Sequence, residues 1–122
     1  MAAAEAEAMK NNWPMAIVIL DSTDHPVMLH RVDNTQYGSI LVAEDKAQTA
    51  LDFRRPSKVL EDLVAQGGIG MRTLGLRGAT PIEGGFPIIV DGKVIGAIGA
   101  SGGTAPQDGP VAKAGADAAA AK

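Results

Sequence analysis

The stretch that most limits the fold of this chain is PIEGGFPIIVDGKVIGAIGASGG, which runs from Pro81 to Gly103. Two short runs of mainly β-branched residues flank Asp91-Gly92, and Asp-Gly in that setting is among the strongest short signals for a β-hairpin. Glycines crowd both ends of this predicted hairpin. Three explanations compete for them: a phosphate-cradling loop, close packing in a crowded core, and a pocket where a flat ligand meets bare backbone.

The phosphate loop is the weakest of the three explanations. The glycines of GAIGASG follow the spacing G-x-x-G-x-x-G, and no Gly-Lys-Ser/Thr occurs in the chain, so both phosphate-loop patterns fail. Close packing would explain Gly96 and Gly99, which interrupt a strand. A turn with positive φ would explain Gly84 and Gly85. Neither explains the clustering at both ends of the hairpin, so a ligand pocket stays open.

The rest of the chain predicts a second hairpin and several helices. Strands are expected at 15–20 and 27–32, around the turn at 21–26, and helices at 2–10, 39–53, 57–66 and from about 106. Ser57 is a candidate N-cap and Gly67 a candidate C′ residue, and Thr104 with Gln107 has the capping-box pattern. Residues 69–80 are loop-like, with room for short strands, and the tail should lose order from about residue 116. We therefore predict a single α+β domain over residues 1–122.

Composition excludes several classes of function. The 122 residues contain no cysteine, which excludes disulfides, zinc–thiolate sites and thiol nucleophiles. The net charge is −3, the basic residues are scattered and only four residues are aromatic, so nucleic-acid binding is not expected. No apolar run reaches the length of a membrane helix, and the alanine-rich N-terminus lacks a signal-peptide pattern, so we expect a cytoplasmic protein without a membrane partner.

Several motifs, in order along residues 13–115, resemble one family. They are AIVILDSTDHPVMLHRVDNTQ, SILVAEDKAQTALDFRRPSKVLEDL and PIEGGFPIIVDGKVIGAIGASGGTAPQDGPVAKAG. The chain is similar to the GlcG/HbpS-like family, the haem-binding and haem-degrading-domain group that includes the C-terminal domain of PduO-type proteins. The resemblance implies a profilin-like or PAS-like sandwich with a five-stranded antiparallel sheet. It also implies homo-oligomers, from dimers to octamers, and in several members bound haem.

The chain departs from the family pattern at its first turn. The family usually has D-x-G-G-H there, whereas this chain has DSTDH, with Thr23 and Asp24 in place of the glycines and His25 in the histidine position. The N-terminal helix is also shorter than is usual in the family. These departures leave the geometry of the turn and of the oligomer open.

His25 is the first candidate site residue, because the resemblance associates a histidine at this turn with haem. A neutral imidazole can ligate haem iron or another transition metal. Asp24 beside it would favour the protonated imidazole, which opposes ligation. The alternative is an exposed turn histidine with no ligand. Strand alternation places His30 on the opposite face, as a surface or interface residue.

Candidate ligand-binding side chains lie in two further segments. Arg31 could hold a carboxylate such as a haem propionate, with Asp33 beside it, although a structural ion pair is the preferred explanation of both residues. Lys46 and Thr49 share one face of the predicted helix at 39–53 with Phe53, and Lys46 could serve an anionic ligand. Phe53 is better explained as a core residue.

The glycine-rich hairpin supplies the remaining candidates, which are Glu83, Gly84, Gly85, Pro87, Gly99 and Gly102. Bare amides there could line a pocket, and Glu83 is the carboxylate closest to the glycines. If the protein is an enzyme, Glu83 and His25 are the candidate catalytic residues, moving a proton. A turn or capping role for Glu83 remains the alternative. Ser57 and Ser101 lack the G-x-S-x-G context of a hydrolase nucleophile.

Three functions follow, in order of preference. The first is a small cytosolic homo-oligomer that binds haem or a similar flat apolar ligand in a glycine-lined pocket. The second is an enzyme without an organic cofactor that acts on a small organic acid or aldehyde of a catabolic pathway. The third is a non-catalytic accessory subunit, in which the alanine-rich termini pack between copies.

Overall fold

The computed structural model describes residues 1–121. In chain order its elements are α1 (Ala2–Lys10), β1 (Ala16–Asp21), β2 (Pro26–Arg31), α2 (Gly38–Phe53), α3 (Ser57–Gln66), the 3-10 helix η1 (Gly68–Gly75), β3 (Gly85–Val90), β4 (Lys93–Ser101) and α4 (Ala105–Ala120). This arrangement of two hairpins and flanking helices confirms the predicted α+β class.

The sheet has four strands among the described residues, in the antiparallel order β2-β1-β4-β3. The two predicted hairpins account for all of them, so the five-stranded sheet implied by the family resemblance is wrong for this chain. The segment in which we allowed short strands instead forms η1 and an irregular return. Gly67 and Gly68 turn the chain there with φ values of +69° and +55°, outside the range of a β-strand.

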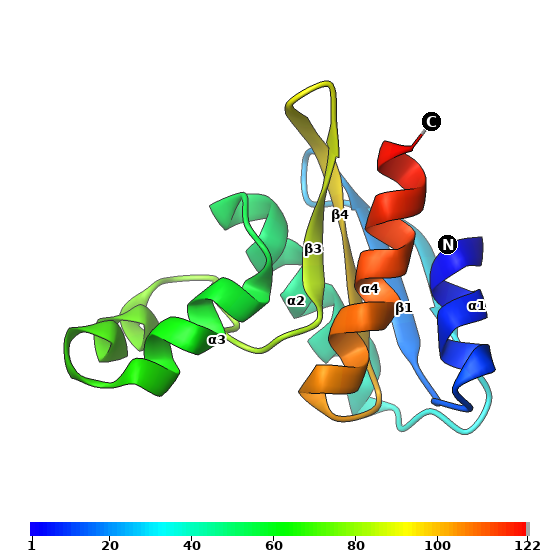
Figure 1. The fold of residues 1–122 in the computed structure, drawn as a ribbon, viewed down its shortest axis with the longest axis horizontal. Helices are drawn as coiled ribbons and strands as arrows, with labels where there is room; N and C mark the ends of the chain where they lie inside the picture. The colour runs from blue at the N-terminus through cyan, green and yellow to red at the C-terminus, as the bar shows by residue number, and fades with distance from the viewer. Residues whose placement is uncertain (122) are drawn as a thin grey trace.

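Helices cover both faces of the sheet, with α2 on one face and α1 and α4 side by side on the other (Figure 1). Strand residues alternate between the two layers, as the strand period requires. On the α2 side, Val18 and Leu20 pack with alanines of α2. On the other side, Ile17 and Ile98 pack with Val111 and with alanines of α1 and α4. The many small side chains let the helices lie close to the sheet.

Helices α1 and α4 pack against each other within one chain. Ala4 and Ala8 are fully buried, and a Cβ added at Gly115 would come within 3.3 Å of the Cβ of Ala4. The alanine-rich termini therefore contact each other within one chain, whereas the hypothesis of an accessory subunit had them pack between copies. Helix α4 continues to Ala120, past residue 116 where we expected the chain to lose order.

Two predicted helix caps have different outcomes. The capping box of Thr104 and Gln107 at the start of α4 is confirmed. Ser57 is not the N-cap of α3, because Pro56 takes that position. The hydroxyl of Ser57 instead donates to the carbonyl of Ile82 at 2.6 Å and accepts from the amide of Gly85 at 2.9 Å. Ser57 thus fixes the chain as it enters β3.

Helices α3 and η1 extend away from the sheet (Figure 1). Their exposed apolar side chains include Val59, Ile69 and Leu74. None of the helices formed by residues 1–121 is both long enough and apolar enough to cross a membrane.

Candidate functional site

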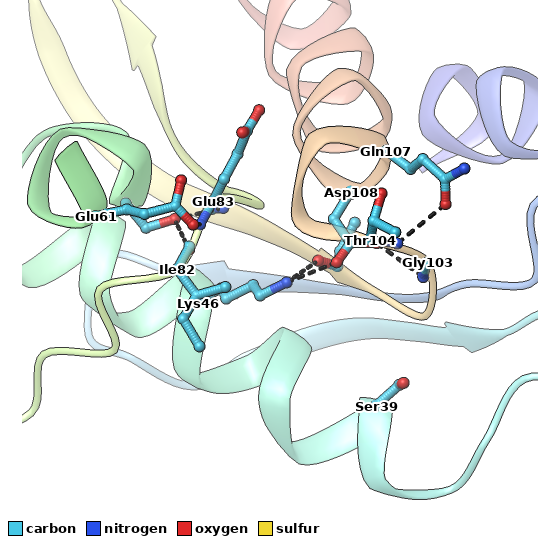
Figure 2. Close-up of polar contacts among 12 residues, drawn as sticks. Ser39, Lys46, Glu61, Ile82, Glu83, Gly103, Thr104, Gln107 and Asp108 are labelled. Atoms are coloured by element: carbon cyan, nitrogen blue, oxygen red, sulfur yellow. Dashed lines mark hydrogen bonds and ion pairs between the residues drawn. The ribbon is translucent and has the colours of Figure 1, made fainter. Parts of the chain in front are cut away.

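Lys46 lies at the centre of a buried polar cluster rather than at a ligand surface. Its Nζ donates to Oδ2 of Asp108 at 2.8 Å and to the carbonyl oxygen of Ala100 at 3.2 Å (Figure 2). Both charged side chains are only 2% exposed. The prediction that Lys46 holds an anionic ligand is therefore wrong for the folded chain, since an internal carboxylate already neutralises it.

The surrounding backbone holds this ion pair in place. A Cβ at Gly84 would lie 2.8 Å from Cδ of Lys46, so only glycine leaves room for the lysine side chain. Asp108, in the first turn of α4, also accepts from the amide of Gly103 at 3.0 Å. Burial raises the pKa of the Asp108 carboxyl, while the Lys46 ammonium and the Gly103 amide act in the opposite direction.

The other glycines of the predicted pocket are also closed by the chain itself. A Cβ at Gly99 would overlap the carbonyl oxygen of Ala43, and one at Gly85 would overlap the carbonyl oxygen of Lys46. Gly102, with φ +152°, lies in the same way against the carbonyl of Pro14. Close packing of backbone therefore explains the glycines at 84, 85, 99 and 102, since other parts of the chain fill the position that a side chain would take.

Thr49 and Pro87 have structural contacts as well. The hydroxyl of Thr49 donates to the carbonyl of Asp45 at 2.8 Å and accepts from the amide of Thr80 at 2.8 Å, which ties the segment after η1 to α2. Phe53 is half-buried near the end of the same helix. Pro87 is buried in β3 and borders a pocket of about 210 Å³ together with Phe86.

Glu83 stands apart from the Lys46–Asp108 pair and points away from it (Figure 2). Its amide donates to Oε1 of Glu61 at 3.2 Å, and its carboxylate packs against Gly109 of α4. Burial and the neighbouring Glu61 raise the pKa of the Glu83 carboxyl. Glu83 precedes β3 at the end of the sheet where β1 begins, whereas His25 lies beyond the end of β1. The six residues of β1 span roughly 20 Å. The two residues considered for acid–base catalysis are therefore not brought together within one chain.

Hydrogen bonds from Thr23 and His25 to Asp21 stabilise the turn that contains His25. Oδ1 of Asp21 accepts from the hydroxyl of Thr23 at 2.7 Å, from its amide at 2.8 Å and from the amide of His25 at 3.1 Å. The hydrogen bond from the Thr23 side chain, followed by the backbone amides, lowers the pKa of Asp21. Thr23 Oγ1 also lies 2.8 Å from Nδ1 of His25. The imidazole is exposed, and this contact orients it through Nδ1, leaving Nε2 for a ligand.

The backbone conformation at Asp24 is one that favours glycine, the residue of the family pattern at this position. Its φ is +67°, in the left-handed region that glycine adopts without strain. Its Oδ1 is buried and has no hydrogen-bond partner among the described residues. Burial, and then the nearby carboxyl of Asp52, raise the pKa of Asp24 to about 6. The turn thus contains a carboxyl group that changes charge near neutral pH.

A pocket of about 690 Å³ adjoins this turn. Its walls come from the β1–β2 turn, the end of α2 and the β3–β4 hairpin, and consist of Ser22, Leu51, Asp52, Arg54, Ile89, Gly92, Lys93 and Val94. Three of these side chains are aliphatic and two are cationic. The sequence did not reveal the pocket, because its three wall segments are far apart along the chain. In the sequence, Arg54 is one of two adjacent arginines before Pro56, and nothing there points to a pocket.

Arg31 and Asp33 lie at the other end of β2, and both are exposed. The Arg31 guanidinium stacks on the ring of Tyr37, 4.8 Å from its centroid, and its Nη1 reaches the carbonyl of Thr35 at 3.4 Å. Asp33 borders a pocket of about 320 Å³ beside Trp13. The described residues show no ion pair between Arg31 and Asp33.

His30 is on the opposite face of β2 from Arg31, where its Nδ1 lies 2.8 Å from Oε1 of Glu5. It is a surface residue held by α1. Within residues 1–121, no three histidine, aspartate or glutamate side chains gather closely enough to hold a metal ion. Of the two histidines, His25 is the one on the turn whose Ser22 borders the large pocket.

Known proteins resemble this chain in both sequence and structure. A family model described as haem degrading protein HbpS-like matches residues 1–117. Protein GlcG of Escherichia coli K12 is 41% identical over 101 residues, which cover 83% of this chain and 74% of GlcG. The crystal structure of Klebsiella pneumoniae protein ORFY superposes with a TM-score of 0.87 at 27% identity, covering 99% of this chain and 85% of ORFY. The crystal structure of a PduOC–haem complex superposes with a TM-score of 0.83 at 28% identity, covering 97% of this chain and 86% of PduOC.

Proposed function

This chain belongs to the HbpS-like family, and from that premise we propose that it binds haem, or a flat ligand of similar shape and charge, beside the β1–β2 turn. The observation that carries the proposal is the position of His25. Its imidazole is exposed and oriented through Nδ1 by Thr23, on the turn whose Ser22 borders the 690 Å³ pocket. The haem complex of the similar protein PduOC supports the choice of ligand.

The residues present fit such a ligand. Ile89, which is 44% exposed, and the partly buried Val94 supply aliphatic contacts for a porphyrin face, while Leu51 is largely buried. Arg54 and Lys93 supply two cations for the two propionates of haem, and with the carboxylate of Asp52 the charged side chains that line the pocket sum to +1. The pocket volume falls within the range of small-molecule sites in proteins. When bound in this way, haem would supply a redox-active iron, and His25 would hold it through Nε2.

Asp24 sets a condition on binding. The pKa of Asp24 is raised to about 6, so its carboxyl carries a negative charge at pH 7, which repels the propionates of a haem bound beside this turn. We therefore expect Asp24→Gly, which restores the residue type of the family pattern, to strengthen binding near pH 7. The same substitution relieves the left-handed strain at this position.

The proposal is tested by titrating the purified protein with haemin and following the Soret band. We expect a saturable shift near one haem per chain that is lost in His25→Ala. His30→Ala is the matched control, because this histidine lies on the neighbouring strand and is bonded to Glu5. A shift that survives in His25→Ala would remove His25 as the ligand, and no shift in the unmodified protein would refute haem binding.

The charge requirement has its own test. Arg54→Gln and Lys93→Gln should each weaken haemin binding, by a factor of roughly five to ten for the loss of one exposed ionic hydrogen bond. Haemin dimethyl ester, which lacks the propionate charges, should bind these variants and the unmodified protein equally. If the substitutions weaken both ligands alike, the two cations do not act on propionates.

A further inference from the structure

A second pocket, of about 320 Å³, lies at the end of β2 opposite to His25. It forms where the loop after β2 passes the C-terminal end of α1 (Figure 1), and it shares no wall residue with the pocket beside the β1–β2 turn. Its walls include Met9, Asn12, Trp13, Pro14, Val32 and Asp33. The volume is at the lower end of the range for small-molecule sites, which suits one small head group rather than a porphyrin.

Trp13 gives this pocket an aromatic wall. It is the only tryptophan of the sequence, and its side chain is half-buried, with part of it packed against the core on the α1 and α4 side of the sheet. Its backbone amide donates to the carbonyl of Ala8 at 2.9 Å, which fixes the residue at the end of α1. Met9, whose side chain is 65% exposed, borders the same space. An indole ring attracts cations more strongly than the other aromatic side chains do.

The electrostatics of the pocket also favour a cation. Asp33 is the charged residue of its walls, and it makes no ion pair within residues 1–121. The cations of the adjoining segments have other partners, since Lys10 pairs with Glu7 at 3.9 Å and Arg31 stacks on Tyr37. The C-terminal end of α1 borders the same space, and it carries the partial negative charge of the helix dipole.

We propose that this pocket binds a small organic cation that carries a methylated ammonium group. Such a head group is apolar and charged at once, so it can contact Trp13 and Met9 while it stays close to the carboxylate of Asp33. An anionic ligand would be repelled by the same carboxylate. The proposal does not rest on haem binding, because His25 and the 690 Å³ pocket lie at the other end of β2.

Because the sequence contains one tryptophan, the fluorescence of Trp13 reports on this pocket directly. The probe is choline, and the matched control ligand is its uncharged carbon isostere, in which a tert-butyl group replaces the trimethylammonium group. We expect choline to change the fluorescence of Trp13 saturably in the millimolar range. The isostere, and sodium chloride at the same concentrations, should leave the fluorescence unchanged.

Two pairs of variants test the charge requirement. Asp33→Asn should weaken choline binding by roughly fivefold or more, because it removes the carboxylate. Its matched control is Asp45→Asn, which removes the same charge from an exposed position of α2 outside the pocket. Met9→Lys places a cation at the pocket and should abolish the response, whereas Met28→Lys, on the exposed strand β2, should keep it. Circular dichroism checks that each variant is folded.

Three results would overturn the proposal. The first is no response of Trp13 to choline, and the second is an equal response to choline and to its isostere, which would mean that the pocket does not select for charge. The third is an unchanged affinity for choline in Asp33→Asn. Loss of the haemin response with choline binding intact would refute only the proposed function.

Discussion

Replacing Lys46 with methionine should destabilise the protein strongly although no cavity forms. Methionine is close to lysine in length and fills the same space beside Gly84. The change removes the cation that neutralises Asp108, whose side chain is 2% exposed. Removing one partner of a buried ion pair lowers the free energy of unfolding by about 3–5 kcal/mol, because the remaining charge stays buried without a counter-charge. The carbonyl of Ala100 also loses its donor.

A loss of this size is large compared with the roughly 5–15 kcal/mol by which domains are stable. For a chain of this length it corresponds to a fall in Tm of roughly 10–20 °C. The assay is urea denaturation at pH 7.5, with thermal unfolding as a second measurement. Lys58→Met is the matched control, since Lys58 pairs with Asp62 at 2.9 Å on the surface, where both side chains are about half exposed. This control should unfold close to the unmodified protein.

The pH dependence of the Lys46→Met variant gives a second readout. Without the ammonium, burial raises the pKa of Asp108 further, so the folded state takes up a proton more readily than the unfolded state. The variant should therefore regain stability as the pH falls toward 5. Lys46→Met combined with Asp108→Leu should recover most of the loss, because it removes both charges. If Lys46→Met costs less than about 1 kcal/mol at pH 7.5, the ion pair does not neutralise a buried charge.

Two further predictions concern the turn and the glycines. Burial and Asp52 raise the pKa of Asp24 to about 6, so folding is favoured when Asp24 is protonated. We therefore expect Asp24→Asn to have a larger free energy of unfolding than the unmodified protein at pH 8. This difference should shrink as the pH falls through 6 to below 4. If urea denaturation gives the same difference in the free energy of unfolding between the two proteins at pH 8 and at pH 4, this prediction is wrong. Gly99→Ala should lower the free energy of unfolding by about 2 kcal/mol or more, because the new Cβ would overlap the carbonyl of Ala43. Gly38→Ala has open space at the start of α2, so its effect on stability should be neutral or slightly favourable. Similar Tm values for both alanine variants would show that the backbone at residue 99 can move away.

The sequence by itself determined the local elements of this protein. Asp91-Gly92 between two apolar runs predicted the β3–β4 hairpin, and Thr104 with Gln107 predicted the start of α4, because turn and cap chemistry acts within a few residues. The same local rules placed α1, α2 and the first hairpin. They also indicated four strands, and the fifth came only from the family resemblance. The position of His25 in the turn before β2 was likewise visible in the sequence.

Only the tertiary structure decided what the side chains of those elements contact. Lys46 looked available to a ligand, yet it meets Asp108, which lies 62 positions later in the chain. Gly99 looked like part of a pocket, yet α2 packs against it. The pocket beside the β1–β2 turn has walls from three separate segments, including Arg54 and Lys93. Such contacts depend on how the layers pack, and no short-range pattern along the chain encodes which distant residue fills a given space.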